Sequence, residues 1–132
     1  MARTPLAQLV AAVAVSLVLI VLLVGLVRFA TALGSDPGAP PRAGAMTINI
    51  LAGMIAAGLG GYFCARRAPE GRVTIAAGLL FGLFLIVGLL VGRATATPAQ
   101  PLWYQSLTTL LGASGLLTGV VIGTSRRARD RT

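Results

Sequence analysis

Long apolar runs alternate with short polar connections along the chain. The runs cover about residues 6–27, 47–65, 73–91 and 102–122. A helix rises about 1.5 Å per residue, so runs of about 19 to 22 residues span about 29 to 33 Å, close to the roughly 30 Å of a bilayer's hydrocarbon core. The pattern predicts an all-α membrane protein with four transmembrane helices, in which residues 1–132 form a single integral membrane domain.

Proline, glycine and charged residues fill the three connections between these runs, at residues 34–45, 66–72 and 93–101. Proline lacks the backbone N–H that a helix interior requires, so the helices must end at these connections. Connections this short place consecutive helices side by side and in opposite directions. We therefore expect an antiparallel bundle.

The first run also has the outline of a secretory leader, because Arg3 precedes it and Ala-Thr-Ala follows it at residues 30–32. Its apolar stretch of about 22 residues is longer than the roughly 7 to 15 residues of a leader's apolar region. Arg28 also lies before the Ala-Thr-Ala sequence. These features favour an uncleaved first helix.

The composition agrees with lipid as the main solvent. The 132 residues are 56% hydrophobic and only 11% charged, with a mean hydropathy of +0.89, whereas soluble domains contain about 25% charged residues. A net charge of +8 and a pI near 11.8 would suggest a nucleic-acid partner in a soluble protein. Here the arginines lie at the ends of apolar runs, so membrane orientation explains them and we expect no nucleic-acid partner.

The arginines are distributed unequally between the two sides of the predicted bundle. The side with both termini carries Arg3, Arg66, Arg67, Arg72, Arg126, Arg127, Arg129 and Arg131, and the opposite side carries Arg28, Arg42 and Arg93. Positive residues are retained on the cytoplasmic side of membrane proteins. The bias predicts a multi-pass protein of the bacterial cytoplasmic (inner) membrane with both termini cytoplasmic. The residues that determine this topology are Arg66, Arg67, Arg72, Arg126 and Arg127.

Two segments sixty positions apart resemble each other. Residues 51–68 and 111–128 are both rich in small residues, and both end in Arg-Arg-Ala. Two repeated helical hairpins would produce this pattern, and so would chance similarity between low-complexity membrane segments. Both interpretations stay open.

Small residues at a spacing of four predict close helix packing in the second and fourth runs. Residues four apart share one helix face, where small side chains let another backbone approach. The predicted packing residues are Gly53, Ala57, Gly61, Gly115, Gly119 and Gly123. We expect the second, third and fourth helices to form the tight centre and the first to face lipid. Packing within one chain and self-association through a remaining face are both compatible with the pattern.

The spans offer little that could carry out chemistry. Within the residue ranges given above, the four apolar runs contain no Asp, Glu, Lys, Arg or His, so they lack the buried ionisable group that proton-coupled transport needs. Cys64 is the single cysteine and the chain has no histidine, so we expect no metal site, no cofactor and no catalytic residues. Asn49 is the candidate polar anchor between helices, and we expect Arg28 and Arg93 to reach toward lipid headgroups.

The turn from Gly60 to Pro69, with the pattern Gly-Gly-Tyr-x-x-Ala-Arg-Arg-Ala-Pro, resembles the turn that ends the second helix in small four-helix membrane proteins of bacteria. This resemblance implies the four-helix layout and no activity. Two other families of similar size do not match. Small multidrug-resistance transporters carry a glutamate in the first helix, which is absent here. Fluoride channels carry their glycine-rich segment near the N-terminus, unlike residues 58–66 of this chain.

These observations favour a non-enzymatic accessory or structural membrane subunit. A small oligomeric channel or transporter is the alternative, and a holin-like pore former is the third. The expected partners are the lipid bilayer and either further copies of the chain or a larger membrane complex.

Overall fold

The computed structural model describes residues 4–33, 42–94, 96 and 101–131, and these form four α-helices and no strand. The helices are α1 (Pro5–Ala32), α2 (Ala43–Arg67), α3 (Val73–Ala94) and α4 (Leu102–Arg129). Each is long and apolar enough to cross a membrane. The predicted all-α fold is therefore confirmed, with four helices in the described residues that are long and apolar enough to span a membrane.

Local chemistry explains where the helices begin and end. Thr4 caps α1, because its hydroxyl accepts a hydrogen bond from the Ala7 N–H at 3.2 Å, and Pro5 occupies the first helical position, which needs no N–H partner. After α2, Ala68 takes an extended conformation (φ −63°, ψ 148°), as expected for a residue before proline. Gly71, at φ +77°, then completes the turn into α3.

All four helices extend beyond the apolar runs that predicted them. α1 continues through Arg28 to Ala32, and α4 continues past Ile122 to Arg129. An arginine at a helix end does not interrupt backbone hydrogen bonding, and its long side chain can reach a polar region from inside the helix. Hydropathy therefore marks the apolar part of each helix, and the helix itself is longer.

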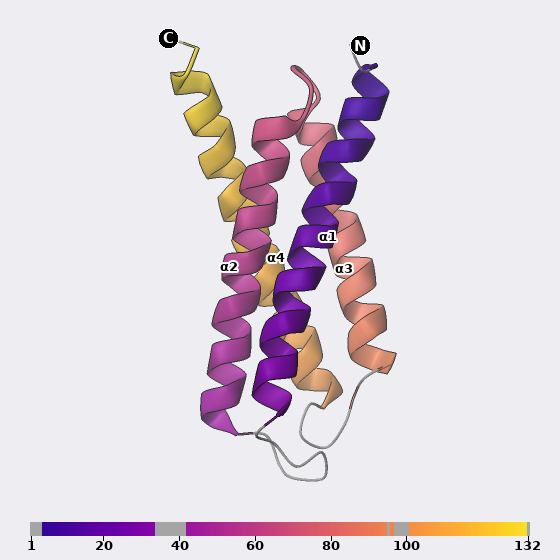
Figure 1. Ribbon diagram of the computed structural model, residues 1–132, viewed down its shortest axis with the longest axis vertical. Coiled ribbons are helices and arrows are strands. Elements are labelled where there is room, and N and C mark those ends of the chain that lie inside the picture. Colours follow the sequence, from indigo (N-terminus) through magenta and orange to yellow (C-terminus); the bar gives the residue numbers. More distant parts are fainter. Residues whose placement is uncertain (1–3, 34–41, 95, 97–100, 132) are drawn as a thin grey trace.

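The α2–α4 pair forms the centre of the bundle. These two helices share the most extensive contact in the molecule, while α1 packs mainly on α2 and α3 mainly on α4. In Figure 1 the N-terminus, the turn between α2 and α3, and the C-terminus lie at one end of the molecule. In the most apolar stretch of each helix, 44% of α2 and of α4 is buried, against 22% of α1 and 17% of α3.

Glycines bring the backbones of α2 and α4 into direct contact. A Cβ on Gly61, Gly115 or Gly119 would overlap a backbone carbonyl oxygen of the facing helix. A Cβ on Gly123 would lie 2.9 Å from the Tyr62 carbonyl oxygen. Only hydrogen fits at these positions, so the helices approach closely and gain van der Waals contact along their length, which is the main attraction available between helices in lipid.

The expectation that α2, α3 and α4 form the tight centre holds only in part for α3, and α1, although largely exposed as expected, also packs on α2. In α3, Gly88 and Gly92 lie against Thr109 and Gln105 of α4. A Cβ on Gly78 or Gly82 of α3 would meet no other atom within 4 Å, so this small-residue pair faces outward. α1 packs on α2 through a stripe of buried residues at a spacing of about four: Leu9, Ala12, Val13, Ser16 and Ile20. The buried Ala12 and Ser16 supply the small surface in α1 that the glycine count did not reveal.

Candidate functional site

Arg28 lies one turn before the end of α1 and points into the bundle. Its side chain is partly buried, and its Nη1 donates a hydrogen bond to Oε1 of Gln105, in the first turn of α4. Gln105 is only 1% exposed. The sequence predicted that Arg28 reaches toward headgroups, and it did not predict this amide acceptor inside the bundle. Arg93, at the corresponding end of α3, is exposed.

Asn49 connects α2 to the same end of α1. The hydroxyl of Thr31 lies 3.2 Å from Asn49 Oδ1 and 3.0 Å from the Arg28 carbonyl oxygen, so its single proton is shared between two acceptors. Asn49 is 5% exposed. The structure thus places Asn49 between two helices, in the same region as Arg28 and Gln105.

Tyr104 adds a buried phenol to this region. Its side chain is 1% exposed and lies close enough to Arg28 to interact with it electrostatically. Among the described residues, neither the Tyr104 hydroxyl nor the Nε of Arg28 has a hydrogen-bond partner, and both atoms are buried. Buried polar atoms are nearly always paired. Two unpaired donors on adjacent side chains mark this region as unusual.

A cavity of about 170 Å³ adjoins Arg28 between α1, α3 and α4. Aliphatic side chains of α1 and α3, together with Phe84, form most of its wall. Thr108 and Thr109 also line it, but their hydroxyls donate to the carbonyl oxygens of Tyr104 and Gln105 at 2.9 and 3.0 Å. The cavity is therefore apolar along its length and ends at one guanidinium group.

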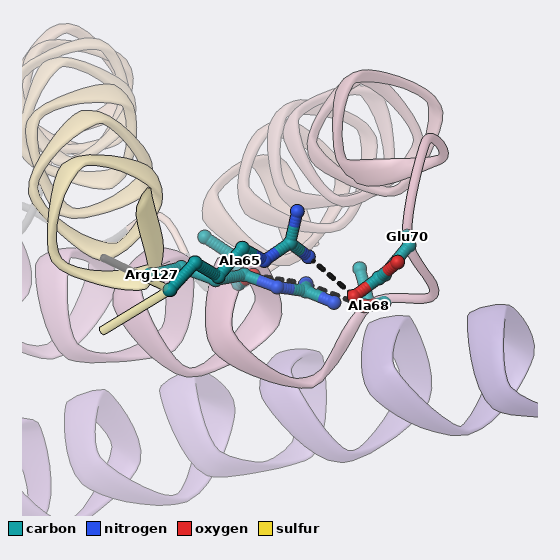
Figure 2. Close-up of polar contacts among 5 residues, drawn as sticks. Ala65, Ala68, Glu70 and Arg127 are labelled. Atoms are coloured by element: carbon teal, nitrogen blue, oxygen red, sulfur yellow. Dashed lines mark hydrogen bonds and ion pairs between the residues drawn. The ribbon is translucent and has the colours of Figure 1, made fainter. Parts of the chain in front are cut away.

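A second polar region ties the C-terminal part of α4 to the α2–α3 turn. Arg127 Nη1 donates to the carbonyl oxygens of Ala65 and Ala68, at 3.0 and 2.6 Å (Figure 2). These carbonyls belong to the end of α2, where helix geometry leaves acceptors unpaired. Two ion pairs, Arg66–Asp130 and Arg131–Glu70, flank the contact on the exposed surface.

The other arginines predicted to set the topology lie at this same end. Arg67 stacks on the Phe63 ring at 5.3 Å, and Arg126 on the Tyr62 ring at 6.0 Å. Arg72 is exposed in the turn before α3. A hollow of about 520 Å³, lined in part by Arg66, Arg67 and Arg127, opens beside the turn.

The predicted packing residues all lie in α2 or α4. Gly53, Ala57 and Gly61 are buried in α2, and Gly119 and Gly123 are buried in α4, with Gly115 partly buried between them. Cys64 is fully buried in the same packed region. Among the described residues, no group of three or more Cys, Asp or Glu could hold a metal ion.

Sequence reasoning missed Gln105, Tyr104 and the cavity. Gln105 is an uncharged amide inside a predicted span, and this was the signal that could have been used, because an amide in hydrocarbon needs a partner. The partner, Arg28, is 77 positions away and belongs to another helix. No local pattern indicates such a pairing.

The four apolar helices define a small multi-pass membrane protein. No protein family, curated protein or solved structure matches this chain.

Proposed function

We propose that the protein is a non-enzymatic accessory or structural subunit of the bacterial cytoplasmic membrane, folded as an antiparallel bundle with both termini cytoplasmic. The observation that supports this function best is the closed packing of α2 against α4. Glycine backbones meet along this interface, so no water-filled path runs between the two central helices.

The outward surface of α3 gives such a subunit a face for neighbouring membrane helices. Gly78 and Gly82 are open on this face, and Ile75 and Ile86 are 55% and 57% exposed. Small residues flanked by branched apolar side chains let helices approach in lipid. A larger membrane complex is therefore the partner that this face suits.

Photo-crosslinking in cells tests the accessory role. A photoreactive amino acid at Ile75 or Ile86 is expected to give discrete protein adducts, while the same amino acid at Leu22, an exposed position on α1, serves as the matched control. Adducts to lipid alone from both α3 positions would contradict the proposal.

Orientation follows from the arginines gathered at the end that holds both termini. A reporter enzyme that is active only in the periplasm, fused after Thr132, is expected to be silent. The same reporter inserted between Pro40 and Pro41 is expected to be active, and the reverse result would contradict the orientation.

A small oligomeric channel or transporter is the second candidate, and the cavity beside Arg28 is the observation that favours it. Flux of a small neutral solute and of chloride in proteoliposomes distinguishes the two functions. The accessory role predicts flux equal to that of empty vesicles. Flux that exceeds this level, and falls when Gly25 in the cavity wall is replaced by leucine, would establish the channel instead.

A further inference from the structure

The cavity next to Arg28 has the dimensions of a site for a lipid chain. Leu17 and Arg28, both in its wall, are eleven residues apart on α1, which corresponds to about 16 Å along the helix. One leaflet contributes about 15 Å to the hydrocarbon core. The volume of about 170 Å³ is similar to that of an engineered cavity of about 150 Å³ that binds benzene, so a stretch of about six chain carbons fits inside.

The cavity opens to the surrounding lipid between α1 and α3. Val21 and Val91 belong to its wall, and they are 48% and 49% exposed. Gly25 also lies in the wall, is exposed, and has no other atom within 4 Å of the position where a Cβ would be. A chain can therefore enter sideways from the bilayer, without passing through the packed centre.

The positive charge of Arg28 at the end of the cavity favours a lipid with an anionic headgroup. Among the described residues the carboxylates are Glu70 and Asp130, and both lie at the opposite end of the bundle, paired with Arg131 and Arg66. Among the described residues, Arg28 donates to the neutral amide of Gln105, which does not compensate its positive charge. A cation at the edge of hydrocarbon attracts an anion that can accept its remaining hydrogen bonds.

We propose that this cavity binds an anionic phospholipid, with one acyl chain between α1 and α3 and the phosphate on Arg28. Arg28 lies four residues from the end of α1, about 6 Å along the axis, so the proposal places its guanidinium close to the headgroups. The chain then runs toward the bilayer centre beside Val24 and Leu17, in the direction that a lipid of that leaflet already has. Binding therefore requires no reorientation of the lipid.

Native mass spectrometry of the full chain in a neutral detergent tests this proposal. Phosphatidylglycerol is the anionic probe and phosphatidylcholine the zwitterionic one. The wild-type protein is expected to retain phosphatidylglycerol in preference to phosphatidylcholine. Arg28→Gln removes a charge-assisted hydrogen bond and is expected to weaken phosphatidylglycerol binding roughly tenfold or more. Arg93→Gln, which removes an exposed arginine at the same end, is the matched control and is expected to bind like the wild type.

A second pair of variants tests the acyl-chain part of the site with Arg28 in place. Gly25→Leu adds a bulky side chain to the cavity wall, at a position where a Cβ meets no other atom within 4 Å, and is expected to reduce phosphatidylglycerol binding. Gly78→Leu, in open space on α3, is expected to leave binding unchanged. This pair also keeps the proposal testable if Arg28→Gln fails to fold. Unchanged binding in Gly25→Leu, or equal loss in Arg28→Gln and Arg93→Gln, would overturn the proposal.

Asp36 is tested separately as a counter-ion of Arg28, because it lies outside the described residues, in the connection between α1 and α2. Asp36→Asn is expected to bind phosphatidylglycerol as the wild type does. A gain of binding in this variant would identify Asp36 as the counter-ion of Arg28 and would overturn the proposal.

Discussion

Gly119 of α4 faces the backbone of Gly58 in α2 so closely that no Cβ fits between them. Gly119→Ala is therefore expected to force the two central helices apart and to lower the free energy of unfolding by about 1 to 3 kcal/mol, the usual cost of overpacking. Thermal unfolding in detergent, followed by circular dichroism, measures the change. Gly78→Ala is the control, since its Cβ meets open space. Equal destabilisation by both changes would contradict a specific contact.

Arg28 and Gln105 are expected to be energetically coupled across α1 and α4. Replacing either residue leaves its buried partner with an unpaired polar group, at a cost of about 1 to 3 kcal/mol. Arg28→Met and Gln105→Leu together leave no unpaired group, so the double variant should cost less than the sum of the single variants. A double-mutant cycle is expected to give a coupling of about 0.5 to 3 kcal/mol, and additive effects would contradict the pairing.

Asn49→Ala is expected to destabilise the bundle by about 1 kcal/mol, because it removes the one of the two Thr31 acceptors that lies on α2, and with it a buried polar contact between α1 and α2. Hydrogen bonds between membrane helices are worth about 0.6 kcal/mol on average and at most about 1.7. Thr47→Val is the control, since its hydroxyl is exposed and donates to the Ala43 carbonyl oxygen within its own helix. Unfolding in a graded detergent mixture measures both, and a larger loss in Thr47→Val would contradict the assignment.

Arg127 and Arg66, at the other end of the bundle, are expected to contribute differently to the free energy of unfolding. Arg127→Gln removes two hydrogen bonds to the end of α2 and should lower the free energy of unfolding by about 1 to 3 kcal/mol. Arg66→Gln removes an exposed ion pair with Asp130, and it should have little effect. Thermal unfolding at low and high salt measures the contrast, and a larger loss in Arg66→Gln would contradict it.

The sequence predicted the elements of this fold better than their arrangement. Each spanning helix depends on a continuous run of apolar residues, which is a local property and can be read directly. Which helices meet depends on shape complementarity between distant segments. Gly78 and Gly82 of α3 have the same spacing as Gly115 and Gly119 of α4, but only the latter pair faces another backbone.

The polar contacts of Arg28, Gln105 and Asn49 were harder to predict, because they too join segments that are far apart in the sequence. An arginine at the end of an apolar run can donate to lipid headgroups, to an acceptor inside the bundle, or to both. The contact inside the bundle depends on Gln105, which the fold places beside Arg28 although the two are 77 positions apart in the sequence. Asn49 was recognisable because an amide inside a span needs a partner, although its partner in α1 was not.

The central α2–α4 pair also has a consequence for how the protein is made. The two helices that hold each other most closely are separated in the chain by the whole of α3. During synthesis, α2 enters the bilayer with its glycine face uncovered and stays so until α4 has been translated. The core of this bundle is therefore assembled last. A ribosome stalled within α3 would leave in the membrane a chain whose α2 glycine face is still uncovered and accessible to other proteins.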